Sequence, residues 1–238
     1  MNTTLVLGIE TSGTSTGLAL AASGKVVAEL VERSICGHNE VLMPLLDQLL
    51  KEAGVKVRDL SGVGVDVGPG MFTSLRVGTS TAKGLAVAHR LPIVGVSTLW
   101  SLARTARPTL DGVLSLIDAR KHQVYAALYL EGKPAIPPSV MSPEELVSKV
   151  GSMPSGRASL VVAGNGAGIC ADLLVAAGIE LVLSGIEIAS PRVVALEAGE
   201  RIARGQVDEV AALEPLYLRR TDAELAREQK LRPKAQLN

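Results

Sequence analysis

Hydrophobic positions along the chain change between a period of two and a period near 3.6, and the same succession occurs twice. An apolar run over residues 5–9 ends in Glu10, and a short polar connection leads to a second apolar run and a Gly24-Lys25 turn. These runs predict a β-hairpin. The pattern then predicts a helix over 38–53, a strand over 62–67, a Gly68-Pro69-Gly70 turn and a helix over 72–89.

The second half of the chain repeats this succession with different residues. An apolar run over 114–117 ends in Asp118, and a polar connection leads to another apolar run and a Gly132-Lys133 turn. The elements expected next are a helix over 142–150, a strand over 159–163, a Gly164-Asn165-Gly166 turn and a helix over 168–177. A long internal repeat of this kind predicts an α/β fold of two duplicated lobes, each a mixed sheet flanked by helices. Glu10 and Asp118 are then expected near a central cleft.

The expected domain boundaries follow from the repeat. The N-terminal lobe is predicted to cover residues 1–106 and a second, reduced lobe residues 107–190, because Arg107-Pro108-Thr109 interrupts the pattern. A helix over about 191–205 begins at a proline and ends at a glycine, and we expect it to pack back on the first lobe. Residues 219–238 are expected to form a flexible tail.

Composition narrows the functional classes. Lys and Arg together number 24, as do Asp and Glu, and the aromatic residues are one Trp, three Tyr and one Phe. A chain with neither a basic excess nor many stacking platforms is not expected to bind nucleic acid on its own. Cys36 and Cys170 have no disulfide or metal-ligand spacing, the N-terminus has no signal-peptide pattern, and no apolar run is long enough for a bilayer. We therefore expect a cytoplasmic protein without membrane contact.

The turn Gly68-Pro69-Gly70 is the most informative short motif. It joins a buried-strand pattern to a helix that starts near Phe72, and a helix N-terminus leaves backbone N–H groups without intrahelical partners. Such groups suit either a bound anion or a docked backbone segment. The helix after the turn carries small residues on one face, at a spacing of four: Ser74, Gly78, Ala82 and Ala86. This face packs either on the chain's own sheet or on a helix of a partner.

Four motifs occur in an order that is similar to one known family. They are Gly8-Ile9-Glu10-Thr11-Ser12, Gly68-Pro69-Gly70-Met71-Phe72-Thr73-Ser74-Leu75-Arg76-Val77-Gly78, Gly95-Val96-Ser97-Thr98-Leu99 and Ile117-Asp118-Ala119-Arg120, with Tyr217-Leu218-Arg219 near the end. Together they resemble the TsaB (YeaZ) family, a branch of the actin/Hsp70/sugar-kinase superfamily. Met71 and Ser74 depart from that family's more usual Ser and Gly, which affects the detailed contacts at the turn.

The resemblance implies a role in making threonylcarbamoyladenosine on tRNA. A chain of this family would be a non-catalytic subunit that pairs with the catalytic subunit TsaD, or with a second copy of itself, and works with the ATPase TsaE. The assembly would transfer threonylcarbamoyl to N6 of adenosine 37 in tRNAs that read ANN codons. The chain would meet tRNA only through the complex. ATP or ADP with Mg²⁺ is implied only for the assembled complex, and no cofactor is implied for the isolated chain. The tail after Arg219 either touches tRNA or a partner, or is a solvated end.

The resemblance also places a partner surface on the predicted helices 38–53 and 72–89. The interface residues that it implies are His38, Val41, Leu42, Leu45, Leu75, Gly78, Ala82 and Lys83. His38 has a second interpretation, as a capping or solvated residue. The nucleotide-binding residues that it implies are Glu10, Thr11, Gly68, Gly70 and Asp118.

The carboxylates Glu10 and Asp118 allow two interpretations. In related kinases such groups help to hold Mg²⁺, and the alternative function is therefore a small ATP-dependent kinase or ATPase. In the other interpretation both carboxylates accept hydrogen bonds from turn N–H groups and serve the scaffold, which the extra methylene of Glu10 favours.

The metal site of TsaD has no counterpart in this sequence. The histidine pair of TsaD corresponds by position to Thr98 and Leu102, and a leucine cannot bind a metal ion. The three histidines of this chain are far apart and have no metal-ligand spacing: His38, His89 and His122. We therefore expect neither a metal site nor catalysis in this chain.

Overall fold

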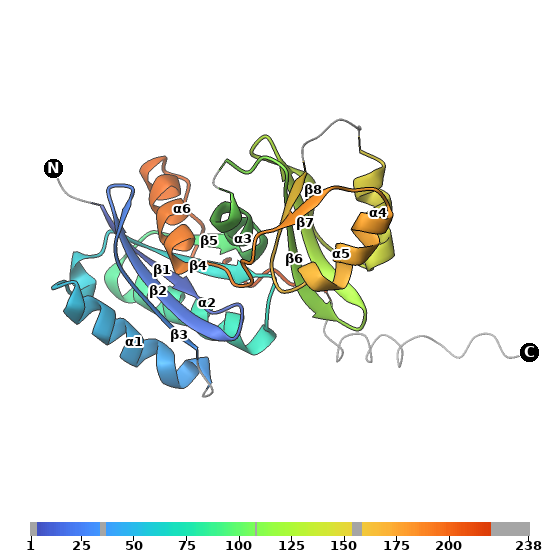
Figure 1. Cartoon of the computed structure of the whole chain (residues 1–238). Helices are drawn as coiled ribbons and strands as arrows, with labels where there is room; N and C mark the ends of the chain where they lie inside the picture. Colours follow the sequence, from blue (N-terminus) through green and yellow to red (C-terminus); the bar gives the residue numbers. More distant parts are fainter. Residues whose placement is uncertain (1–3, 34–36, 108, 154–158, 220–238) are drawn as a thin grey trace, which may run out of the picture.

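The computed structural model describes residues 4–33, 37–107, 109–153 and 159–219. Two lobes lie side by side, each built on its own sheet, with the helix α3 (Thr98–Ala106) between them (Figure 1). Cys36, Pro108 and the predicted tail beyond Arg219 lie outside the described residues. Within the described ranges, no helix combines the length and the hydropathy needed to cross a lipid bilayer.

The first lobe holds a five-stranded sheet with the strand order β3-β2-β1-β4-β5. Its elements are β1 (Leu5–Glu10), β2 (Ser15–Ala22), β3 (Lys25–Arg33), α1 (His38–Glu52), the 3-10 helix η1 (Val57–Asp59), β4 (Gly62–Gly68), α2 (Phe72–His89) and β5 (Ile93–Ser97). The strands β1, β2 and β3 form an antiparallel meander, and β4 and β5 extend the sheet in parallel with β1.

The second lobe repeats this topology, with the strand order β10-β9-β6-β7-β8. Its elements are β6 (Val113–Arg120), β7 (Gln123–Leu130), β8 (Lys133–Met141), α4 (Pro143–Gly151), β9 (Leu160–Ala163), α5 (Ala167–Ala176) and β10 (Leu181–Leu183), and the helix α6 (Pro191–Ala203) follows. Starting from the meander, both sheets have the same order and the same parallel extension. The predicted fold class, two duplicated α/β lobes with mixed sheets, is confirmed.

Strand periodicity divides the first sheet between two helical layers. Leu7 and Ile9 are fully buried in the cluster that contains the inner faces of α1 and α2, whereas Val6, on the alternate face, packs with Val194 and Ala198 of α6. Figure 1 shows α6 on the opposite side of this sheet from α1. The helix that follows the second lobe in sequence thus packs on the first lobe.

Two glycines let α6 lie close to the first sheet. A Cβ added to Gly8 would lie 2.5 Å from the backbone nitrogen of Ala195 and 2.5 Å from the carbonyl oxygen of Pro191. A Cβ on Gly64 would lie 2.6 Å from the Cβ of Ala198. Side chains at these two positions would therefore force the helix away from the sheet.

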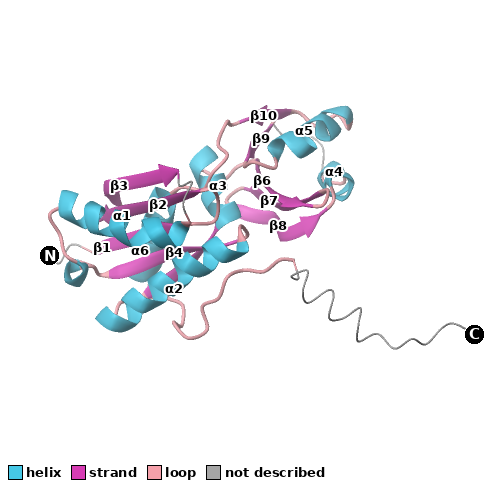
Figure 2. Cartoon of the chain, turned by 90° about the horizontal axis from the view of Figure 1, so that it is seen from below, coloured by secondary structure: helices cyan, strands magenta, loops and turns pink. Residues whose placement is uncertain are grey.

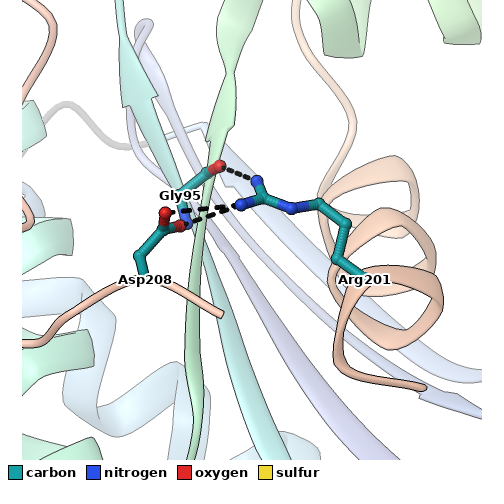
Figure 3. Close-up of polar contacts among 3 residues, drawn as sticks. All are labelled: Gly95, Arg201 and Asp208. Atoms are coloured by element: carbon teal, nitrogen blue, oxygen red, sulfur yellow. Dashed lines mark hydrogen bonds and ion pairs between the residues drawn. The ribbon is translucent and has the colours of Figure 1, made fainter. Parts of the chain in front are cut away.

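The segment after α6, residues 206–219, runs along the first lobe and is termed the strap. Asp208 pairs with Ile93 at the edge of β5, and its carboxylate accepts a hydrogen bond of 2.8 Å from the Gly95 nitrogen (Figure 3). Arg201 of α6 donates to the Gly95 carbonyl at 2.8 Å and to Asp208, and this closes a three-residue clasp. The strap then passes α2 toward the second lobe (Figure 2).

Candidate functional site

A cleft of about 420 Å³ lies between the two lobes, which is within the size range of small-molecule sites. Its walls come from turns of both lobes, and they include Ser12, Gly70, Met71, Thr98, Asp118, Arg120, Tyr125 and Asn165. Of the five residues predicted to bind nucleotide, only Gly70 and Asp118 line it. Asp118 is thus at the cleft, as predicted, whereas Glu10, Thr11 and Gly68 are not among the lining residues.

Glu10 lies inside the protein and is used by its own turn. Its side chain is 1% exposed, and its Oε1 accepts hydrogen bonds from the backbone nitrogen of Ser12 at 2.7 Å and from the Ser12 hydroxyl at 2.5 Å. Burial, and then the nearby Asp66, raise the pKa of Glu10 to about 8. The neighbouring Thr11 is likewise buried and donates to the carbonyl of Ser74 at 2.9 Å.

Asp66 is the acidic neighbour of Glu10, and the sequence analysis did not single it out. Its Oδ1 accepts hydrogen bonds from the Gly68 nitrogen at 2.8 Å and from the Thr98 hydroxyl, while its buried Oδ2 has no partner among the described residues. Burial raises its pKa to about 7. The sequence feature that could have identified Asp66 is a carboxylate within an otherwise apolar strand. Ile9 lies opposite Val65, so the residues that follow them are neighbours.

Asp118 has a more exposed environment than Glu10. Its side chain is 25% exposed, its Oδ1 accepts from the Arg120 nitrogen at 2.7 Å, and its Oδ2 forms an ion pair with the Arg120 guanidinium at 3.1 Å. The backbone nitrogen of Asp118 donates to Asn165, which belongs to the glycine turn of the second lobe. Glu10 and Asp118 were both expected near the cleft; Asp118 lines it, whereas Glu10 is buried beside Asp66, because β1 and β4 are adjacent parallel strands. Both predicted carboxylates accept hydrogen bonds from turn N–H groups, as the scaffold interpretation expects.

The Gly68-Pro69-Gly70 turn docks on backbone. The nitrogen of Met71 donates to the carbonyl of Ser12 at 2.9 Å, and a Cβ on Gly70 would lie 2.5 Å from the same oxygen. Gly68 has a φ of 102°, a conformation that favours glycine. The turn therefore fixes the start of α2 against the β1–β2 connection, which is the docked-backbone alternative.

Thr98 and Leu102, the two positions that the resemblance aligns with a histidine pair, carry no imidazole or carboxylate. Thr98 donates its hydroxyl to Asp66, and Leu102 is 1% exposed. In the described part of the chain, no group of three or more His, Cys, Asp or Glu side chains could hold a metal ion. His122 contacts Glu144 at 3.3 Å on the surface of the second lobe.

Most of the residues predicted to form the partner surface are buried within the first lobe, so they offer little exposed area to a partner. They are Leu42, Leu45, Leu75, Gly78 and Ala82. The small residues at a spacing of four face the chain's own sheet: a Cβ on Gly78 would lie 2.3 Å from the Thr11 hydroxyl. A spacing of four identifies one helix face, but it does not say whether that face meets the sheet or the solvent.

Two further predicted interface residues have contacts within the chain. The ring nitrogens of His38 lie 2.8 Å from the Thr16 hydroxyl and 3.1 Å from the Gly13 carbonyl, and burial lowers the pKa of this histidine. Lys83 donates to the strap carbonyls of Ala211 and Leu213. Neither is a free surface group, so both serve the fold. Val41 is half-buried and packs against the first core.

The outer sides of α1 and α2 do offer a surface. A shallow groove between them has a volume of about 410 Å³. We term it the α1–α2 groove, and it is lined by Asn39, Leu42, Met43, Thr73, Arg76, Val77, Ser80 and Thr81. Met43 is 53% exposed, and the groove mixes apolar and hydroxyl groups around one arginine.

Comparison with known proteins identifies the family. Residues 20–227 match the family model described as TsaD, tRNA N6-adenosine threonylcarbamoyltransferase. The chain is 32% identical to the tRNA threonylcarbamoyladenosine biosynthesis protein TsaB of Escherichia coli over 225 residues, which are 90% of this chain and 94% of that protein. The chain belongs to the TsaB family.

Other relatives and a solved structure agree with this assignment. The TsaB protein of Bacillus subtilis is 38% identical over 125 residues, which are 52% of this chain and 54% of that protein. The structure described as YeaZ from Pseudomonas aeruginosa superposes with a TM-score of 0.75 and 28% identity, over 90% of this chain and all of that one. The predicted membership of the TsaB (YeaZ) family is confirmed.

Proposed function

We propose that this chain is a non-catalytic subunit of the complex that installs threonylcarbamoyl on N6 of adenosine 37 in ANN-decoding tRNAs. The observation that carries the proposal is the match to a TsaB protein over nearly the full length of both chains. The partners of this subunit would be a TsaD-like catalytic subunit and a TsaE-like ATPase, and a second copy of the chain is the competing partner for the same surface.

The state of the carboxylates supports a scaffold role. Glu10 accepts two hydrogen bonds from Ser12 in the buried interior, and Asp66 accepts two from its own surroundings. Among the acidic residues predicted to act, only Asp118 is at the cleft wall, where it is paired with Arg120. If ATP or ADP occupies the cleft in the complex, Gly70 and Asp118 are the residues that it would meet.

The α1–α2 groove is the surface that we assign to the partner. Two helices of 15 and 18 residues provide room for an interface of about 800 Å² on each side. The interface residues that we propose are the exposed residues of the groove, Met43, Thr73 and Ser80, together with the half-buried Thr81.

Co-purification with a TsaD homologue tests this proposal. The Ser80→Arg variant places a long charged side chain in the groove, and its matched control, Ser148→Arg, carries the same change on the exposed face of α4. We expect the control and the wild type to form the complex and the Ser80→Arg variant to lose it. Failure of the wild type to bind would refute the function, and binding by the Ser80→Arg variant would refute the surface.

The alternative of an ATP-dependent enzyme has a separate test. Calorimetry of the isolated chain with Mg-ATP should detect no micromolar binding that depends on Asp118. If the wild type does bind Mg-ATP with micromolar affinity, the Asp118→Asn variant shows whether the binding depends on this residue. Such binding, accompanied by ATP turnover, would replace the scaffold proposal.

A further inference from the structure

Two of the chain's five aromatic side chains stack on each other at the surface. Phe72, at the start of α2, and Tyr217, in the strap, have ring centroids 5.1 Å apart and are 40% and 41% exposed. The guanidinium of Arg76 lies 4.0 Å from the centroid of the Phe72 ring, and its Nε donates to the Tyr217 hydroxyl at 3.0 Å. We term these three residues the aromatic cluster.

The cluster holds Arg76 in one orientation without neutralising it. Among the described residues, no carboxylate forms an ion pair with Arg76, and its own partners are a ring face and a neutral hydroxyl. A guanidinium fixed in this way keeps donors for an external anion. It also loses less side-chain freedom on binding than a free arginine does.

The cluster and the α1–α2 groove form one continuous surface. Arg76 lines the groove and belongs to the cluster, and Thr73, one residue after Phe72, lines the groove as well. Met71 and Leu216 flank the cluster and are 52% and 37% exposed. The strap thus adds a third element to a surface otherwise made by two helices.

The composition of this surface favours a protein over RNA. Exposed Tyr and Arg surrounded by apolar groups are typical of the residues that dominate protein interfaces. An RNA surface would require several basic groups. The other lysine or arginine of α2, Lys83, is already bound to strap carbonyls.

We propose that the aromatic cluster anchors the partner subunit by binding a carboxylate that the partner presents within an apolar face. This inference rests on the proposed function and adds to it a specific anchor and the strap as part of the interface. Tyr217 has two roles in it, because it orients Arg76 and contributes its own exposed ring face.

The affinity for the TsaD homologue, measured by calorimetry at two salt concentrations, tests the inference. Arg76→Glu should weaken binding by about 30-fold or more, because it places a like charge against the partner's carboxylate. Arg76→Gln should weaken binding less and should remove most of the salt dependence of the wild type, which a purely structural role would not change. Arg58→Glu, on η1 beyond the far end of α1, is the matched control and should bind as the wild type does.

The outcomes separate this inference from the proposed function. If Ser80→Arg abolishes binding while Arg76→Glu binds within twofold of the wild type, the function stands and the anchor is wrong. If Arg76→Glu lowers the thermal unfolding midpoint, the test relies on Arg76→Gln instead. An affinity for the TsaD homologue that depends on salt as strongly in this variant as in the wild type would overturn the anchor. Loss of tRNA binding by the complex with unchanged affinity for the partner would mean that the cluster contacts RNA instead.

Discussion

The two lobes share their strand order, yet their glycine turns follow different residues. Gly68 and Gly164 occupy equivalent turns and have almost the same φ, 102° and 104°. Two positions earlier the first lobe has Asp66 and the second has Val162. The first lobe therefore buries a pair of carboxylates at the ends of β1 and β4, whereas Asp118, at the end of β6 in the second lobe, is partly exposed at the cleft wall. Duplication preserved the frame while the chemical groups at the cleft diverged.

The same comparison explains how closely helices approach the two sheets. Gly8 and Gly64 lie on the face of the first sheet that is turned toward α6, whereas the face of the second sheet that is turned toward α3 carries larger side chains, Val113 and Tyr129 among them. The glycines admit the backbone of α6, whereas these side chains of the second sheet pack against Leu99 and Ala103 of α3. Each sheet thus has a helix on its second face, α6 in the first lobe and α3 in the second.

The largest expected effect comes from adding one methyl group to the first sheet. Gly8→Ala should destabilise the protein by about 3 kcal/mol, because its Cβ would meet two backbone atoms of α6 that cannot move separately. The matched control is Gly199→Ala in α6, where the nearest atom would be 3.8 Å away and a gain of up to about 1 kcal/mol is expected. Urea unfolding measures both, and equal stabilities would contradict the close approach.

The buried carboxylate pair predicts a pH dependence of stability. The folded-state pKa values of Glu10 and Asp66 are raised from 4.5 to about 8 and from 3.8 to about 7, so the native state holds protons that the unfolded state has lost. Their contribution is present in full below about pH 4 and is lost as the pH rises toward 8. We expect the loss of this contribution to lower the free energy of unfolding by about 1–3 kcal/mol between pH 5 and pH 8.

Glu10→Gln isolates this effect, because the amide oxygen can still accept from Ser12. The lowered pKa of His38 acts in the opposite direction in both proteins, so the difference between their unfolding curves reports the pair. The variant should gain relative stability as the pH rises from 5 to 8. A constant difference across this range would contradict the assignment of raised pKa values.

The clasp at the edge of β5 gives the smallest of these effects. Asp208→Asn keeps an acceptor for the Gly95 nitrogen but removes the ion pair with Arg201. The side chains of Asp208 and Arg201 are 34% and 26% exposed. Partial exposure screens such a pair, and we expect a loss of about 1 kcal/mol. Asp172→Asn on the exposed face of α5 is the control, and thermal unfolding of both variants gives the comparison. A loss no greater than that of the control would show that the clasp contributes little.

Much of the frame could be predicted from the sequence, because repeats and periodicity report local structure. The helices expected over 38–53 and 72–89 are found at His38–Glu52 and Phe72–His89. The orientation of their faces could not be predicted, since it depends on long-range packing: Gly78 is small because Thr11 lies against it. The Glu10–Asp66 pair required knowledge that β1 and β4 are neighbours, and the strap has no periodic pattern to reveal it.

The most direct test of the account is tRNA modification by the reconstituted complex with a chain that lacks both predicted catalytic carboxylates. The double variant Glu10→Gln/Asp118→Asn should still bind the TsaD homologue and should support transfer of threonylcarbamoyl to tRNA at close to the wild-type rate, because neither group takes part in the chemistry. A loss of more than about tenfold in rate, in a complex that assembles normally, equals more than about 1.4 kcal/mol of transition-state stabilisation. That result would assign a chemical role to this chain and contradict the scaffold account.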